Sequence, residues 1–177
     1  MWVDVLTYSL LNPPAFPRFR RAGFRIEGKH LIFELRPQGC LTLDLSKLEK
    51  VSIIELVNFQ PPRKAIKMEF SIGGGFCILV SVGKNPLAYD RRALRSLLVG
   101  VFSSLLDGVP VKAQGKSGVL RVVPVENGRH GVVLITEAGE ILPVGEDVNG
   151  PGKIKKLVRE FLEAESLLSE GECEEGE

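Results

Sequence analysis

Turn-forming residues divide most of this 177-residue chain into short apolar segments. The chain contains 19 glycines and 11 prolines, and many of them stand between these segments. In residues 41–45, leucines alternate with Thr42 and Asp44, a period of two that is typical of a half-buried β-strand. Residues 73–75 are three glycines that separate AIKMEFSI from FCILVSV, which predicts a β-hairpin. The sequence therefore favours a chain built mainly from antiparallel sheet.

Two longer segments have the period of a helix. Residues 86–106 and 153–168 each place their large apolar side chains on one helical stripe. The first follows six or seven strand-like segments, and the second follows three, GVLRVVPV, HGVVLIT and EILPV. The order predicts an α+β fold, a partly closed barrel or a sandwich of antiparallel strands with two amphipathic helices.

The same order predicts three parts. Residues 1–108 form a β-rich unit closed by the helix 86–106, residues 109–169 form a β-β-β-α unit packed on the first, and residues 170–177 form a disordered acidic tail. Strands closed by one C-terminal helix, in residues 1–107, resemble the topology of pleckstrin-homology-like domains. The resemblance carries no diagnostic motif, and it does not imply phosphoinositide binding because a fold does not define a function.

Composition and cysteine usage favour a cytoplasmic protein. No apolar run approaches the roughly 20 residues that a membrane span requires, and residues 1–10 do not resemble a signal peptide. The three cysteines, Cys40, Cys77 and Cys173, are too widely spaced for a usual zinc site, and their odd number predicts no closed disulfide framework. Cys40 and Cys77 lie in apolar strand patterns, which predicts that both are buried. Few glutamines and asparagines beside many charged residues indicate a thermophile.

The charge is unevenly distributed along the chain. Residues 1–125 carry 18 Lys and Arg against 9 Asp and Glu, a net charge of +9, whereas residues 126–177 carry a net charge of −8. Such a basic body can bind an anionic partner, and nucleic acid is the leading candidate. The candidate anion-binding residues are Arg18, Arg20, Arg21, Arg25, Lys29, Arg63, Lys64, Arg91 and Arg92, and the candidate stacking residues are Phe16 and Phe19.

The same residues can also have purely structural roles. Charged side chains on a strand also occur on any solvated sheet surface, and phenylalanines beside prolines also anchor loops to a core.

The helix 86–106 also presents a face of small residues. Ser96, Gly100, Ser103 and Ser104 would allow another element to approach closely. That element is either a second copy of the chain, which makes the protein a homo-dimer or an adaptor subunit, or a part of the same domain.

The sequence contains little that indicates catalysis. Residues 110–118, PVKAQGKSG, contain the Gly-Lys-Ser of a phosphate-binding loop, but Pro110 stands where the first glycine belongs and a strand pattern follows. We interpret this segment as a loop. The chain has only two histidines, and neither has metal-ligand spacing to a cysteine or another histidine. The sequence therefore predicts a non-catalytic interaction module without metal, cofactor or membrane, whose partner is nucleic acid or an acidic protein. An enzyme assembled from residues distant in sequence is the alternative.

Overall fold

Two antiparallel sheets and two helices make up the described structure. The computed structural model describes residues 2–11, 18–57, 62–81, 88–145 and 147–169, with the backbone alone for residues 88–91. The first part contains β1 (Trp2–Ser9), β2 (Arg20–Glu27), β3 (His30–Leu35), β4 (Cys40–Asp44), the short 3-10 segment η1 (Leu45–Lys47), β5 (Leu48–Leu56), β6 (Arg63–Phe70), β7 (Phe76–Ser81) and α1 (Ala88–Leu106). The second part contains β8 (Pro110–Ala113), β9 (Lys116–Pro124), η2 (Glu126–Gly128), β10 (His130–Thr136), β11 (Ile141–Pro143) and α2 (Gly152–Ser169).

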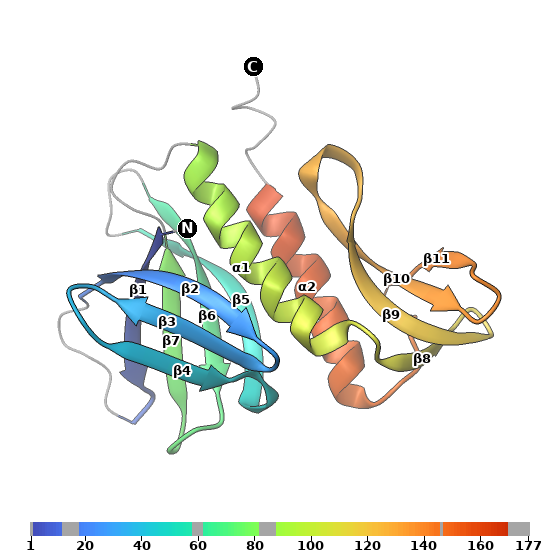
Figure 1. Cartoon of the computed structure of the whole chain (residues 1–177), viewed down its shortest axis with the longest axis horizontal. Coiled ribbons are helices and arrows are strands. Elements are labelled where there is room, and N and C mark those ends of the chain that lie inside the picture. The colour runs from blue at the N-terminus through green and yellow to red at the C-terminus, as the bar shows by residue number, and fades with distance from the viewer. Residues whose placement is uncertain (1, 12–17, 58–61, 82–87, 146, 170–177) are drawn as a thin grey trace.

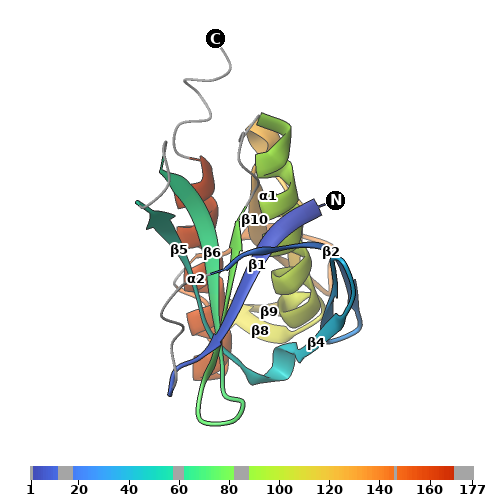
Figure 2. The ribbon, with the colours of Figure 1, turned by 90° about the vertical axis from the view of Figure 1, so that its left-hand side faces the viewer.

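The first sheet has seven strands in the order β4-β3-β2-β1-β7-β6-β5, and the second has four in the order β11-β10-β9-β8. Neither sheet closes into a barrel, because no strand pairing within the described residues joins β4 to β5 or β11 to β8. The larger sheet is instead open and strongly curved, with β2–β4 on one side of α1 and β5–β7 on the other (Figures 1 and 2). The predicted α+β fold with antiparallel sheets and two helices is confirmed.

The two helices lie side by side between the two sheets (Figure 1). One continuous cluster of buried apolar side chains contains residues from both sheets and both helices. At its centre the rings of Phe102 from α1 and Phe161 from α2 pack with their centroids 5.1 Å apart, and both side chains are fully buried. The core therefore joins the two parts of the chain.

The register of the larger sheet decides which side chains face α1. Phe24 of β2 pairs with Phe33 of β3, which pairs with Leu41 of β4, and this row faces the core. The next row places Gly23, Glu34 and Cys40 on the opposite, outer face. Cys77 is buried as predicted, whereas the prediction for Cys40 is wrong, because the leucines that alternate with it take the inner face and leave Cys40 exposed on the edge strand.

The second sheet contains one strand more than the sequence predicted. The segment 110–118, which we interpreted as a loop, is the hairpin of β8 and β9, with Gln114 and Gly115 at positive φ in its turn. On this edge strand, the side chains of Val111 and Ala113 are buried, and those of Pro110 and Lys112 are exposed. Next to the turn, a Cβ on Gly118 would lie 2.3 Å from the carbonyl oxygen of Ile135. Glycine is required there because the backbones of β9 and β10 approach too closely for a side chain.

Helix α2 lies along the free edge of β5 (Figure 2). The Nζ of Lys153 donates to the carbonyl oxygen of Ser46 over 2.9 Å, and the Nζ of Lys156 donates to that of Glu49. One oxygen of the buried Glu160 carboxylate accepts from the N–H of Val51 at 3.3 Å. Side chains of α2 thus satisfy backbone groups that a neighbouring strand would otherwise pair.

Burial gives Glu160 a testable pH dependence. Burial raises the pKa of its carboxyl, although the Val51 N–H and Lys156 favour the charged form. Because the folded chain holds this proton more tightly than the unfolded chain, Glu160 contributes stability as the pH falls from its folded pKa toward its unfolded pKa. Glu160→Gln keeps an acceptor for Val51 but removes the titration. We expect the variant to unfold at a higher temperature than the wild type at neutral pH, and the difference to shrink in mild acid.

Thermal unfolding across this pH range measures the effect. Glu163→Gln, an exposed position one turn further along α2, is the matched control and should leave the pH profile unchanged. Equal pH profiles for Glu160→Gln and the wild type would contradict the raised pKa of the buried Glu160 carboxyl.

Candidate interaction surfaces

The outer face of the four-stranded sheet is apolar. Pro110, Val119, Ile135 and Ile141 pair in one row that crosses β8, β9, β10 and β11. Their neighbours Leu120 and Leu134 point the other way, into the core. The half-buried Val123, the buried Val133 and the exposed Pro143 lie on the same side of the sheet, and we call these seven residues the apolar sheet face. Val119 is 38% exposed and Ile141 is 66% exposed. An antiparallel sheet with one solvent face normally carries polar residues there, so this face is unusual.

Arg121 lies within this face. Its neighbours on the same side of β9 are Val119 and Val123, and its cross-strand partner is Val133. Arg121 is exposed, and no ion pair or hydrogen bond involves its side chain in the described part of the chain. An arginine surrounded by apolar side chains is typical of the residues that dominate binding at protein interfaces.

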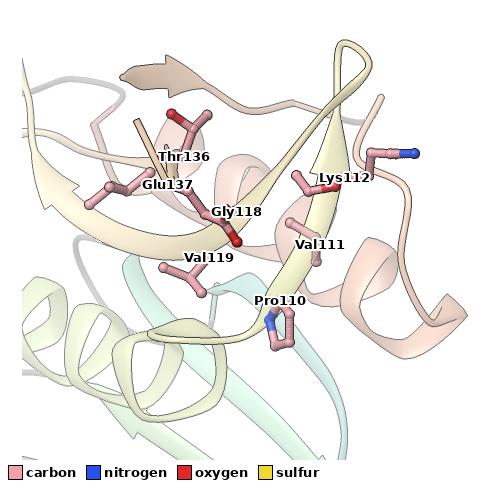
Figure 3. Close-up of a pocket in the computed structure, with 9 residues that line it drawn as sticks. Pro110, Val111, Lys112, Gly118, Val119, Thr136 and Glu137 are labelled. Atoms are coloured by element: carbon pink, nitrogen blue, oxygen red, sulfur yellow. The ribbon is translucent and has the colours of Figure 1, made fainter. Parts of the chain in front are cut away.

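A shallow concavity of about 540 Å³ adjoins the apolar row (Figure 3). Its walls come from β8, β9 and β10 and include Pro110, Val119 and Ile135, while Lys112, Ser117 and Glu137 form its polar side. Beyond that side, Lys116 and Glu140 form an ion pair across 2.6 Å. The arrangement is an apolar surface with a polar margin on one side.

Most of the predicted anion-binding residues have partners within the chain. Arg25 forms ion pairs with Glu27 and Glu34 on the outer face of the larger sheet. Arg21 lies 3.8 Å from Asp4. Arg20 donates to the carbonyl oxygens of Arg36 and Gln38, which holds the turn between β3 and β4. An anion at these positions would compete with existing contacts.

Two of the predicted lysines cap helices. Lys29 donates to the carbonyl oxygen of Ser104 at 2.8 Å, and Lys64 donates to that of Leu167. Both carbonyls lie in the last turn of a helix, where a cation is favourable because those groups lack partners within the helix. Arg63, on β6 beside Lys64, is half-buried. Lys29 and Lys64 are therefore part of the architecture, whereas Arg18 and Arg92 are exposed.

The structure adds an aromatic residue that the sequence reasoning missed. Trp2 is 48% exposed on the outer face of β1, above Gly23, and the guanidinium of Arg36 lies 4.7 Å from its ring centroid. Arg21 lies on the same face, since it pairs with Asp4, two residues after Trp2 on β1. Of the predicted stacking residues, Phe19 is half-buried and Phe16 lies outside the described residues. The alternation of Trp2 with Val3 and Asp4 was a signal for this exposed ring.

The small-residue face of α1 packs largely against its own sheet. A Cβ on Gly100 would lie 2.7 Å from the Cδ1 atom of Ile26 on β2, and the Ser104 hydroxyl donates to the carbonyl oxygen of Gly28. Ser103 is half-buried, and Ser96 is exposed. A second copy would therefore have to displace β2 from Gly100 and Ser104. The homo-dimer stays a prediction.

Few described side chains have the chemistry of a catalytic centre. Burial and a hydrogen bond to Cys77 raise the pKa of Tyr8 to about 12, which opposes its use as a base at neutral pH. Cys77 itself is fully buried. In the described part of the chain, no three His, Cys, Asp or Glu residues are close enough together to hold a metal ion. No described helix is long and apolar enough to cross a membrane.

No protein-family model matches this chain, and neither does any curated protein sequence.

Proposed function

We propose that this chain is a non-catalytic interaction module that binds a protein partner through the apolar sheet face. The observation that carries the proposal is the row of Pro110, Val119, Ile135 and Ile141 across the solvent side of an entire sheet. Contiguous exposed apolar surface with polar margins marks interaction sites in soluble proteins.

The unpaired Arg121 specifies the chemistry of the partner. A cation covered by a purely apolar partner would lose its hydration without compensation, and that loss is costly. A carboxylate on the partner would restore the lost interaction and fix the orientation of the complex. The proposed partner surface is therefore apolar with an acidic side chain opposite Arg121.

Site-specific photo-crosslinking in the source cells tests this function. A photoreactive amino acid at Ile141 should give a discrete adduct, which should disappear when Arg121→Glu is added. Val57, which directly follows β5, is the matched control position, since it is 73% exposed and lies far from this face in the sequence. The same adducts from both positions, or an adduct that survives Arg121→Glu, would contradict the proposal.

We also propose that residues 1–107 have a pleckstrin-homology-like topology. The support is a meander of β1–β4, a second set of strands β5–β7 paired through β7 with β1, and a helix after the last strand. This topology supplies a scaffold and no ligand.

A second candidate function is binding of single-stranded nucleic acid on the outer face of β1–β3. The observation that favours it is the exposed ring of Trp2 beside Arg36 and Arg21, since stacking and phosphate contacts together bind single strands. Asp4, Glu27 and Glu34 on or beside the same face reduce its positive charge. The partner protein is therefore our first choice.

Fluorescence anisotropy with labelled single-stranded oligonucleotides tests the second candidate. Binding should weaken steeply as salt increases, and Trp2→Ala should weaken it by about 1–3 kcal/mol, the value of one stacked base. Arg92→Ala, an exposed arginine on α1, serves as control. Binding that ignores salt, or no binding at low salt, would remove this candidate.

A further inference from the structure

The edge of β5 offers backbone hydrogen-bonding groups to a ligand. β5 is the last strand of the larger sheet, and among the described strands only β6 pairs with it. The N–H of Val51 points away from β6, toward Glu160. Because outward and inward backbone groups alternate along an antiparallel strand, the N–H and C=O groups of Ile53 and Glu55 also point outward.

Helix α2 satisfies only the first half of this edge. Side chains of Lys153, Lys156 and Glu160 bond to backbone groups from Ser46 to Val51. Beyond Val51, no described residue forms a hydrogen bond with the outward groups of Ile53 or Glu55. Within the described residues, the second half of β5 is thus open to pairing, the condition under which an edge strand accepts another strand.

A groove between β5 and α2 reaches this open edge at Ile53. A concavity of about 240 Å³ lies between Val51 to Ile53 on β5 and Glu160 to Leu167 on α2. A second concavity of about 450 Å³ shares Lys50 with it and continues toward Leu10 and Gly75, in the direction away from Glu55. Ala164 is buried and Leu167 half-buried in the helix wall of the first concavity, which suits an apolar side chain.

We propose that this groove binds an extended peptide segment of a protein partner, which adds as a strand to Ile53–Glu55 of β5. Successive outward groups on a strand repeat about every 6.6–6.8 Å, twice the rise per residue, and an extended polypeptide has the matching repeat. The backbone bonds supply affinity, and an apolar side chain of the peptide against Ala164 and Leu167 supplies selectivity. The proposal is independent of the apolar sheet face, which lies on the other sheet.

A proline at residue 55 distinguishes strand addition to β5 from binding elsewhere on the chain. The N–H of Glu55 points outward and its side chain is exposed, so Glu55→Pro removes a group that β6 does not use. Glu55→Ala keeps the N–H and is the matched control. The probe is a phage-displayed library of random heptapeptides selected on the wild-type chain, followed by titration of the enriched peptides as synthetic, labelled probes.

Enriched peptides should bind Glu55→Ala as they bind the wild type and Glu55→Pro about tenfold more weakly, the loss of one backbone hydrogen bond with a steric contribution. Hydrogen exchange on the wild-type chain, with and without an enriched peptide, is a second test that does not depend on whether Glu55→Pro folds. The Ile53 and Glu55 amides should exchange rapidly alone and slowly with peptide, whereas those of Ser52 and Ile54 stay slow throughout. Failure to enrich any peptide, equal binding to both variants, or protection confined to β8–β11 would overturn the proposal.

Discussion

Arg95→Met is expected to lower the free energy of unfolding by about 3–5 kcal/mol, the usual result of removing one partner from a buried ion pair. The Nε of Arg95 on α1 lies 3.1 Å from the Oε1 atom of Glu165 on α2, and the Glu165 side chain is only 5% exposed. The other oxygen of Glu165 is buried without a hydrogen-bond partner in the described structure. Without Arg95, the folded chain would keep an uncompensated buried carboxylate.

Arg95 also connects three elements. It donates to the Ser169 hydroxyl at 2.9 Å and to the carbonyl oxygen of Gly128, in the turn between β9 and β10, at 3.3 Å. Its loss therefore loosens α1, α2 and the second sheet together.

Urea denaturation measures the effect of Arg95→Met, and two further variants test whether loss of the buried ion pair is its cause. Arg95→Met combined with Glu165→Leu should recover most of the lost stability, because replacing both members of a buried pair by apolar residues is often neutral. Arg92→Met, one turn earlier on α1 and exposed, should stay within about 0.5 kcal/mol of the wild type. If Arg92→Met cost as much as Arg95→Met, the buried pair would not be the cause.

Phe161→Ala is expected to cost about 3–5 kcal/mol, the range for truncating a fully buried phenylalanine. Phe161 is 0% exposed and packs against Phe102 at the contact of the two helices. Because α2 contacts both β5 and β10, the cavity would weaken the attachment of both sheets. The variant should still unfold in one transition, at a lower urea concentration.

Unfolding should be followed separately for each sheet, with Trp2 fluorescence for the larger sheet and hydrogen exchange of the β10 amides for the smaller one. Leu162→Ala, at the next position and only half-buried, should cost clearly less. Two separate transitions, with only the smaller sheet affected, would show that the two parts do not share one core.

Local patterns in the sequence predicted the class of fold. Period-two segments became strands, both helical stripes became helices, and the glycine turns at Gly28, Gly73 to Gly75 and Gly139 have the positive φ that such turns use. The sequence did not predict β8, because we compared residues 110–118 with a phosphate-binding loop and, when the comparison failed, interpreted them as an irregular loop. The alternation of Val111 and Ala113 around a Gln-Gly turn was the signal for a hairpin.

The candidate surfaces were harder to predict, because they depend on which residues pair across strands. Lys29 and Lys64 looked like members of a basic strip, but distant carbonyl groups at helix ends occupy them. The apolar sheet face did leave a sequence signal in VVLI at 132–135. A strand that is apolar at consecutive positions has two apolar faces, and the core cluster covers only the side of Val132 and Leu134, although Val133 on the outer side is also buried.

Equilibrium affinity for the crosslinked partner tests the central claim most directly. The purified partner should be titrated against the wild type, Arg121→Glu and Arg92→Glu, the last a charge reversal at an exposed arginine outside the apolar sheet face. We expect Arg121→Glu to weaken binding by about 2–5 kcal/mol, as for truncation of a buried interfacial charge, and Arg92→Glu to leave the affinity nearly unchanged. Equal affinities for the wild type and Arg121→Glu would show that the apolar sheet face is not the binding surface.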